Sequence, residues 1–272
     1  MPLDIGVLAP LTKTPREEIR KVAEFGLRSC QVCTWNPSLY TDPIGQELTS
    51  AAKELGVEVT TLWAGYPGKL VWDFYQGPLT IGLVPPEQRA QRVAALQQGV
   101  RFAARWGLAS ISTHVGFIPE DPNDPLFDGT VEALRQVATT CRELGLGFWY
   151  ETGQETPVTL LQTIEAVGLP NQGINLDTAN LILYGKANPV DALDVFGQHV
   201  RGVHAKDGLY PTNGRQLGKE VPLGEGKVNF PAFMPKLKAL GYKGAITIER
   251  EISGEEQARD IRAAVDFLRP LC

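Results

Sequence analysis

Four residues of metal-ligand type each end a short run rich in β-branched and aromatic residues. They are Glu151 in GFWYE, Asp177 in GINLD, His204 in VRGVH and Glu249 in GAITIE. Successive spacings of 26, 27 and 45 residues leave room for a helix with its turns, and the last also for a long loop. Two glutamates, an aspartate and an imidazole supply mostly oxygen ligands, which suit one divalent cation. In a parallel barrel the ends of neighbouring strands converge on one mouth, so these side chains would share a site there.

The segments that would position these residues repeat a strand–helix unit along the whole chain. Eight runs read as strands, at residues 4–9, 29–35, 58–63, 110–115, 147–151, 173–177, 200–204 and 244–249. Amphipathic segments lie between them, and several open on Thr, Asn or Pro and close on Gly, as helices do. No linker or low-complexity segment divides the chain. The sequence therefore predicts an α/β protein with a single (β/α)8 TIM barrel domain over residues 1–272.

Side-chain parity along the strands agrees with this placement. In a strand, residues two apart share a face. Glu249 thus shares a face with Thr247, and Asp177 shares one with Asn175, while Ile246 and Ile248 point the other way. Polar groups line the inward face and end in a ligand-type residue at the C-terminal end, which is where barrels place their chemistry.

Two connections are too long to be simple turns, one over residues 64–85 after strand three and one over residues 205–228 after strand seven. Long connections in compact domains are usually functional or disordered. The first carries four aromatic residues, Tyr66, Trp72, Phe74 and Tyr75. We expect it to form an ordered lid over a sugar-sized pocket; the alternative is a satellite hydrophobic cluster.

Composition limits the partners and the compartment. A formal net charge of −5 and a pI near 5.4 argue against a surface that neutralises a nucleic-acid backbone. The N-terminal segment MPLDIGVLAPLTKT has no basic stretch followed by an apolar run, and no apolar stretch reaches the length of a membrane span. We therefore expect a soluble, cytoplasmic protein with neither nucleic-acid nor membrane partners. A homo-oligomer is compatible with the sequence.

Two of the four cysteines, Cys30 and Cys33, have the spacing of redox pairs. They fall inside a predicted strand, where positions three apart point to opposite faces. That geometry suits neither a disulfide nor a shared metal, so we interpret them as structural thiols.

Several phrases resemble the xylose isomerase-like TIM barrel superfamily of sugar isomerases and epimerases, which also contains endonuclease IV. They are GINLDTAN, VRGVHAKDG, PLGEGKVNF and AITIERE. The resemblance covers nearly the whole chain and is strongest from Glu151 to Glu251. Its most specific parts are HAKD at 204–207, GEG at 224–226 and the order Glu, Asp, His, Glu.

The resemblance implies roles for the four strand-end residues. In the ketose 3-epimerase and hydroxypyruvate isomerase branches, matching residues bind one Mn²⁺, Mg²⁺ or Co²⁺, and the two glutamates also move the substrate proton. Glu151, Asp177, His204 and Glu249 are thus expected to be the metal ligands, with Glu151 and Glu249 as catalytic residues. Mostly oxygen ligands favour Mn²⁺ or Mg²⁺, and the single imidazole keeps Co²⁺ and Zn²⁺ compatible.

The chain departs from the epimerase pattern at two positions. Asn180 stands where the epimerases carry a histidine three residues after the metal aspartate, and Tyr210 where they carry an arginine about six residues after the metal histidine. Asn180 can still hydrogen-bond a substrate hydroxyl. Arg215 is the candidate to reach inward from the loop instead. These departures put ketohexose epimerisation in question while the enolisation core is intact.

Four further residues are predicted to contact the substrate. His114 would donate or accept a hydrogen bond, with an inner-layer structural histidine as the alternative. Trp35 and Trp63 end strands two and three and would stack on a sugar face, with core packing as the alternative. Lys206 would neutralise an enolate or pair with Glu249.

The predicted function is that of a divalent-metal-dependent sugar isomerase or epimerase in carbohydrate metabolism. It would transfer a proton next to the carbonyl of a small keto-sugar or polyol through a metal-stabilised enediolate. A metal-dependent lyase or dehydratase on a keto-sugar or keto-inositol, including 3-keto-glycoside cleavage, would use the same residues. An endonuclease IV-like DNA-repair enzyme and a non-catalytic sugar-binding barrel are the remaining alternatives.

Overall fold

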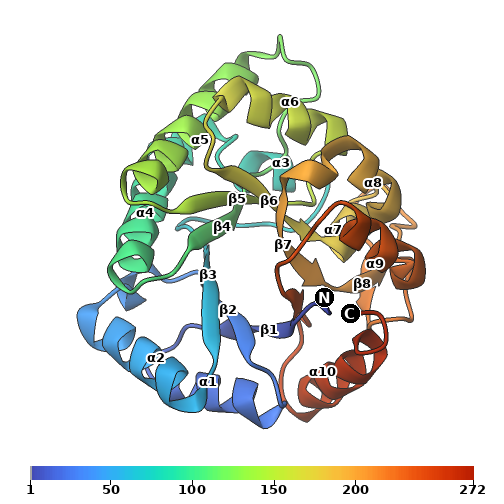
Figure 1. Ribbon diagram of the computed structural model, residues 1–272. Helices are drawn as coiled ribbons and strands as arrows, with labels where there is room; N and C mark the ends of the chain where they lie inside the picture. Colours follow the sequence, from blue (N-terminus) through green and yellow to red (C-terminus); the bar gives the residue numbers. More distant parts are fainter. Residues whose placement is uncertain (1) are drawn as a thin grey trace.

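The computed structural model describes residues 2–272, so Met1, the first residue of the predicted domain, lies outside the description. Eight parallel strands close into a barrel in the order β1-β10-β7-β6-β5-β4-β3-β2, surrounded by helices (Figure 1). The strands are β1 Ile5–Pro10, β2 Ser29–Thr34, β3 Glu58–Ala64, β4 Ser110–His114, β5 Gly147–Glu151, β6 Gln172–Asp177, β7 Val200–Ala205 and β10 Ile246–Ile248. The predicted (β/α)8 architecture is confirmed.

The helices of the outer ring follow the strands in sequence. Their bounds are α1 Pro15–Glu24, α2 Asp42–Leu55, α4 Pro86–Arg105, α5 Pro125–Glu143, α6 Pro157–Val167, α7 Thr178–Leu183, α8 Pro189–Phe196, α9 Phe230–Ala239 and α10 Glu255–Leu268, with a single turn α3 at Gly77–Thr80. Several begin with proline, whose fixed φ suits the first turn and whose missing N–H would have no partner there. Short 3₁₀ turns η1 Pro37–Leu39 and η2 Gly197–His199 complete the connections.

The last barrel strand is shorter than predicted. The sequence predicted residues 244–249, whereas β10 covers only Ile246–Ile248, so Glu249 lies one residue beyond its strand. Its backbone N–H still donates to the carbonyl of Ala205 at 3.1 Å, which holds Glu249 at the mouth beside β7. The side chain therefore reaches the predicted site from a loop that one backbone hydrogen bond keeps in register.

The barrel interior has the predicted alternation. Ile246 and Ile248 are buried in the hydrophobic core between sheet and helices, whereas Thr247 lines a hollow inside the barrel floor. Asn175 also points inward, because a Cβ built on Gly202 would lie 2.2 Å from its Oδ1 atom. Glycine at position 202 thus makes room for a polar side chain in the barrel.

The two long connections are confirmed, and they touch each other. The second contains an antiparallel hairpin, β8 Asp207–Leu209 with β9 Lys219–Val221. An isolated bridge joins Asp73 of the first connection to Gln216 of the second, and the N–H of Phe74 donates to the carbonyl of Arg215 at 3.1 Å. The two connections therefore support one another at the barrel mouth.

Arg92 of α4 holds the connection over residues 64–85 in place through hydrogen bonds to its backbone. Its fully buried guanidinium donates to the carbonyls of Thr80 and Gly82 at 2.7 and 2.6 Å and lies 4.6 Å from the ring centroid of Tyr66. Tyr66 belongs to the main core, while Trp72 keeps 41% of its surface exposed. The alternative of a satellite cluster thus describes Phe74, which packs against a small separate cluster that contains Tyr184. Trp72 instead remains partly exposed at the barrel mouth, where it lines a cavity.

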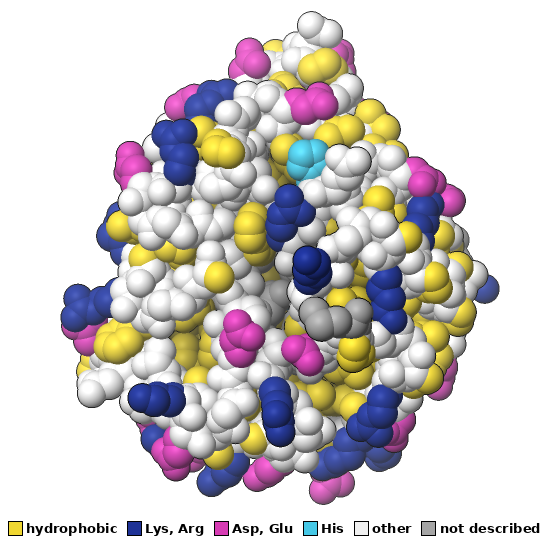
Figure 2. Space-filling model, in the orientation of Figure 1, with side chains coloured by type: hydrophobic (Ala, Val, Ile, Leu, Met, Phe, Trp, Pro, Cys, Tyr) yellow, Lys and Arg dark blue, Asp and Glu magenta, His cyan; other side chains and the backbone are white. Residues whose placement is uncertain are grey.

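Figure 2 shows the face on which the two chain ends meet, where the N–H of Leu3 donates to the carbonyl of Cys272 at 3.1 Å. Lysine and arginine side chains alternate with aspartate and glutamate over the described part of this face, without one dominant sign of charge (Figure 2). All four cysteines are free thiols, as predicted for Cys30 and Cys33. None of the described helices is both long and apolar enough to cross a membrane.

Candidate metal centre

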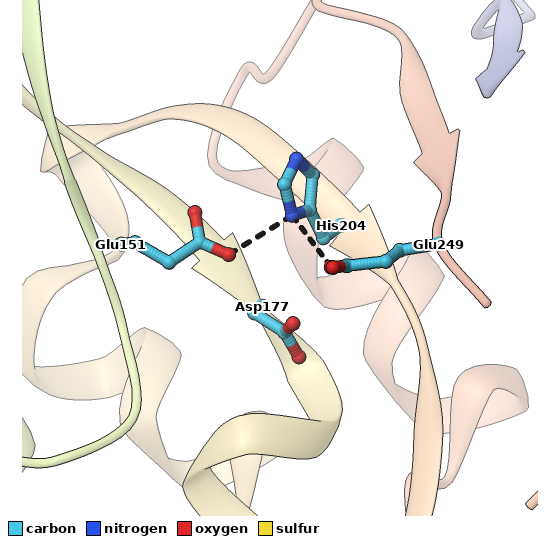
Figure 3. A group of neighbouring side chains, drawn as sticks. All are labelled: Glu151, Asp177, His204 and Glu249. Carbon is cyan, nitrogen blue, oxygen red and sulfur yellow. Dashed lines mark ion pairs between the residues drawn. The ribbon is translucent and has the colours of Figure 1, made fainter. Parts of the chain in front are cut away.

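Glu151, Asp177, His204 and Glu249 meet at the C-terminal mouth of the barrel (Figure 3). Each offers a ligand atom, and these atoms all lie within 4.8 Å of one another. Register explains the convergence, because Asp177 pairs directly with His204 across β6 and β7. The side chain of Glu249 is 12% exposed and that of Glu151 only 2%, so the cluster is accessible mainly from the side of Glu249.

Three of the ligand atoms in the cluster have no hydrogen-bond partner among the described residues. His204 Nδ1 lies 2.9 Å from Glu151 Oε1 and 2.8 Å from Glu249 Oε2 (Figure 3). Within residues 2–272, no hydrogen bond of good geometry satisfies His204 Nδ1, Glu249 Oε2 or Asp177 Oδ2, although all three atoms are buried. Buried polar atoms without partners are costly. Atoms of this kind facing a common point fit a bound cation.

The shifted pKa values of the cluster also indicate that a positive charge would be stabilised there. Burial lowers the pKa of His204, but Glu151 and Glu249 beside it raise the pKa well above its ordinary value. Burial raises the pKa of Asp177 well above its ordinary value as well. The carboxylates therefore attract a proton onto the imidazole, at the place where a divalent cation would supply the same compensation. The mostly oxygen donor set fits such an ion.

Asp177 both caps a helix and offers a ligand atom to the cluster. Its Oδ1 atom accepts a hydrogen bond from the N–H of Asn180 at 2.8 Å and so caps α7, as strand-end carboxylates often do. The cap fixes the side chain and leaves Oδ2 directed at the cluster. Helix capping here orients a metal-type ligand instead of competing with it.

A hydrogen-bond relay inside the barrel holds His204 and Glu151 in place. Gln31 of β2 accepts at Oε1 from His204 Nε2, at 3.0 Å, and donates from Nε2 to Asn175 Oδ1, also at 3.0 Å. Asn175 in turn donates to Glu151 Oε2. Because Nε2 of the imidazole is engaged as a donor, Nδ1 is the nitrogen that faces the cluster and that would bind a cation in place of its proton. Gln31 was not predicted from the sequence, although a glutamine between apolar residues in a buried strand was the available signal.

We expect replacement of Gln31 by methionine to weaken metal binding by about 10–100-fold, the usual effect of losing a group that orients a ligand. The substitution removes the acceptor that fixes the His204 tautomer while keeping the length of the side chain. Isothermal titration with Mn²⁺ measures the change. Gln97→Met is the control, because Gln97 lies on α4 and bonds Thr140 outside the barrel. Equal affinity in wild type and Gln31→Met would contradict the relay.

Lys206 supplies a positively charged side chain next to the cluster, with only 1% of its surface exposed. Its Nζ atom lies 2.8 Å from Glu251 Oε1 and 3.4 Å from Asp177 Oδ2, and it donates to Asn180 Oδ1 at 3.3 Å. Burial lowers the pKa of Lys206, but Asp177 and Glu249 raise it well above its ordinary value. Lys206 is therefore charged and compensates part of the carboxylate cluster.

A network of ion pairs with lysine or arginine could hold the carboxylates without a metal, but among the described residues only Lys206 reaches them. The guanidinium of Arg250, the residue after Glu249, pairs with Glu220 and Asp260 at 2.9 Å each, away from the cluster. Lys206 lies 3.4 Å from Asp177 Oδ2, but it gives no hydrogen bond to Glu249 Oε2, which stays without a hydrogen-bond partner among the described residues.

Asp207, the last residue of the HAKD phrase, is structural. Its carboxylate accepts backbone N–H groups from Gly224 and Gly226 at 3.0 Å each and from Val228 at 3.0 Å. A Cβ built on Gly226 would lie 2.0 Å from Asp207 Oδ1. The HAKD and GEG phrases are therefore linked in the structure, because the aspartate of the first accepts hydrogen bonds from the glycines of the second and so fixes the loop.

A cavity of about 1040 Å³ opens onto Glu249, and Trp35, Trp63, His114 and Asn180 line it as predicted for substrate-contacting residues. Trp72, one of the aromatic residues of the predicted lid, also lines it, with its ring centroid 5.4 Å from that of His114. Burial lowers the pKa of His114. Arg215 lies elsewhere, stacked 5.0 Å from the ring centroid of the exposed Tyr75. The structure thus brings together all the predicted site residues except Arg215.

A family of known proteins matches this chain over most of its length. The sequence model of the family described as "Xylose isomerase-like TIM barrel" matches residues 19–271. The chain belongs to this family. A xylose isomerase domain protein from Planctomyces limnophilus shares 34% identity and a TM-score of 0.93, over 99% of this chain and 97% of that one.

More distant solved structures share the barrel. The 3-keto-D-glucoside 4-epimerase of E. coli has a TM-score of 0.72 at 21% identity, over 99% of this chain and 100% of that one, which shows the fold alone. Ketose 3-epimerases also have this fold. An uncharacterized protein of Methanocaldococcus jannaschii is 26% identical over 174 residues, and the match spans 60% of this chain and 58% of that protein.

Proposed function

We propose that the chain is a divalent-metal-dependent sugar isomerase or epimerase, built as a single domain over residues 1–272. The observation that carries the proposal is the cluster of four ligand atoms within 4.8 Å of one another, two of them from glutamates, at the mouth of a barrel. Sugar epimerases among the relatives with this fold support the same class of reaction. Manganese and magnesium suit the donor set best.

The two glutamates are the proposed proton-transfer groups. They stand on β5 and just beyond β10, with β6 and β7 between them in the barrel order. Glu249 faces the cavity, and Glu151 is held from behind by Asn175. One carboxylate takes the proton from the carbon beside the carbonyl, and the other returns it from the opposite face or to the neighbouring carbon. A bound divalent cation would polarise the carbonyl and stabilise the negative charge that develops on its oxygen.

Neighbouring residues orient the substrate in this proposal. The amide oxygen of Asn180 accepts a hydrogen bond from Lys206, so its NH₂ group can donate a hydrogen bond to a sugar hydroxyl. Burial keeps His114 neutral at ordinary pH, so one ring nitrogen donates while the other accepts. The charged Lys206, close to Asp177 and Glu249, lowers the cost of negative charge on the substrate.

The reaction class is tested by solvent exchange. The metal-loaded protein should incorporate deuterium from D₂O beside the carbonyl of a ketose, and a chelator should stop the exchange. Formation of an eliminated product instead would indicate the lyase alternative. Absence of exchange across a panel of 2-keto and 3-keto sugars would refute the proposed function.

Metal binding should stabilise the fold. With free Mn²⁺ at 100 times its dissociation constant, the free energy of unfolding should rise by about 2.7 kcal/mol, because the ion binds the folded state alone. Asp177→Asn should lose most of that gain. The matched control is Asp191→Asn, an exposed position on α8. Denaturant unfolding with and without metal measures both, and near-stoichiometric metal in Asp177→Asn would contradict the assignment of this ligand.

A further inference from the structure

Glu249 is the only one of the four cluster residues that lies outside a barrel strand. Glu151, Asp177 and His204 belong to β5, β6 and β7, whereas Glu249 follows the last residue of β10. Groups on strands are held more precisely than groups on loops. The hydrogen bond to Ala205 fixes only the backbone N–H of Glu249, so other contacts must set the direction of the loop that carries its side chain.

Arg250, the next residue, joins this loop to two separate elements. Its Nη1 atom lies 2.9 Å from Glu220 Oε1 of β9, and its Nε atom donates to Asp260 Oδ2 of α10, also at 2.9 Å. The three side chains are largely shielded, with 11%, 13% and 15% of their surfaces exposed. Because a guanidinium is planar and its donors point in fixed directions, these two contacts hold Arg250 in one orientation.

Backbone groups next to the Arg250 side chain are also bonded. Glu251 donates its N–H to the same Glu220 carboxylate, at 3.1 Å, and the carbonyl of Arg250 accepts from Gln257 Nε2 at 2.8 Å. From the barrel side, Lys206 Nζ lies 2.8 Å from Glu251 Oε1. The loop is thus held by the β8–β9 hairpin, by α10 and by the barrel, directly after the residue that faces the cluster.

Exposed ion pairs elsewhere in this chain differ from the Arg250 contacts. Arg16 with Glu54 and Arg269 with Asp266 leave between 42% and 75% of each side chain exposed. Exposed pairs of that kind contribute little to stability. Arg250 instead meets two carboxylates in a shielded place, so its loss would remove both side-chain contacts of the loop at once.

We propose that Arg250 is a positioning residue for Glu249. Bridged to Glu220 and Asp260, it keeps the loop at the place where the Glu249 carboxylate lies 2.8 Å from His204 Nδ1 and can share a cation with the other three ligands. Arg250 thereby serves Glu249 both as a metal ligand and as a proton-transfer group. The second of these roles rests on the proposed function, whereas the first depends on the cluster alone.

Metal affinity tests the positioning without a substrate. In Arg250→Met, titration calorimetry should show Mn²⁺ binding weakened by about 10–100-fold, the usual effect of losing a group that orients a ligand. Arg250→Lys keeps the positive charge between the two carboxylates but not the planar fork, so its affinity should fall between those of wild type and Arg250→Met. Arg269→Met, which removes an exposed pair at the end of α10, is the control. Wild-type affinity in both Arg250 variants would overturn the inference.

A double-mutant cycle separates positioning from a general loss of stability. Once Glu249→Ala has removed the ligand that Arg250 orients, Arg250→Met should change Mn²⁺ affinity by less than about threefold, as expected for two residues that act as a unit. Electron paramagnetic resonance of free Mn²⁺ measures the weak binding of these variants. An equal factor in both backgrounds would show that Arg250 acts on the whole fold, and would overturn the inference. Denaturant unfolding in chelator identifies variants that do not fold; the cycle with Arg250→Lys then replaces that with Arg250→Met.

Kinetics tests the effect on proton transfer. With saturating Mn²⁺ and a keto-sugar that exchanges deuterium, Arg250→Met should lower kcat by about tenfold or more while KM changes by less than about threefold. The reason is that the guanidinium is engaged by Glu220 and Asp260 and is not free to bind the substrate.

The alternative outcomes are distinguishable. Arg250 borders the cavity, so a rise in KM at unchanged kcat would mean that it contacts the substrate directly, which would overturn the positioning role. If no keto-sugar exchanges deuterium, the proposed function fails, while the Mn²⁺ affinities still decide whether Arg250 positions Glu249 as a ligand.

Discussion

Glutamine at position 151 or 249 is expected to lower the rate of deuterium exchange beside the substrate carbonyl by about 10²–10⁴-fold, the range attributed to general acid–base groups. The substitution keeps the shape and one oxygen ligand, so Mn²⁺ occupancy should fall much less than turnover. In the structure the two carboxylates both approach His204 Nδ1, at 2.9 and 2.8 Å. A loss of exchange with metal retained would identify them as proton-transfer groups.

The two variants should differ from each other. Glu249 lines the cavity, whereas Glu151 is almost fully covered and accepts hydrogen bonds from Asn175 and, at 3.4 Å, from Ser112. Removing the accessible carboxylate should therefore affect the first proton removal more. Glu165→Gln, at an exposed position of α6, is the control. Exchange at the wild-type rate in both variants would refute the role and make Lys206 or His114 the next candidate.

The fold and the metal-ligand cluster could be predicted because they depend on local patterns. A barrel needs only a repeating alternation of strand and helix, and the C-terminal ends of its strands always share one mouth. Once Asp177 and His204 were placed at neighbouring strand ends, their contact followed from register alone. Glu249 is the exception in detail, since it lies beyond β10 and is held by a backbone hydrogen bond to Ala205 that no pattern shows.

Residues that act across the barrel could not be found in this way. Gln31 lies 173 residues from His204 in sequence, and its contact depends on barrel closure through β1 and β10. Trp72 and Arg215 lie on the two long connections, whose mutual bridge at Asp73 and Gln216 has no sequence signature. That bridge helps to hold Arg215 at the rim near Tyr75, away from the cavity where the sequence placed it. The sequence thus indicated which residue types the loops offer, but not which of these side chains point into the cavity.

Asp207 shows the limit of a recognised phrase. The family resemblance marked HAKD as specific, which could equally mean chemistry or structure. Only the hydrogen bonds from Gly224 and Gly226 to the Asp207 carboxylate identify it as the anchor of the loop that follows the β8–β9 hairpin. Glu220 lies on β9, the strand that leads into this loop, and its carboxylate accepts the N–H of Glu251 at 3.1 Å. A structural aspartate therefore supports the cavity wall indirectly.

Replacement of Glu155 by glutamine is expected to stabilise the protein at pH 8 by on the order of a few kcal/mol, with little effect at pH 4.5. Glu155 follows β5 and is fully buried, and among the described residues its two carboxylate oxygens have no hydrogen-bond partner of good geometry. Burial raises the pKa of Glu155 to about 8 from an ordinary value of 4.5. The folded state thus keeps a proton on this group that the unfolded chain releases above pH 4.5.

The sign of the pH dependence follows from these two values. Below pH 4.5 both states carry the proton, and the group costs nothing. Between pH 4.5 and 8 the unfolded state gains free energy by ionising while the folded state cannot, so this carboxyl lowers the free energy of unfolding progressively until its folded pKa is reached. Glutamine has no proton to lose, and denaturant unfolding in chelator at pH 4.5 and pH 8 should show its advantage only at the higher pH. Glu165→Gln, exposed on the next helix, should behave like wild type at both. A stability difference independent of pH between Glu155→Gln and wild type would mean that Glu155 is not held protonated by burial.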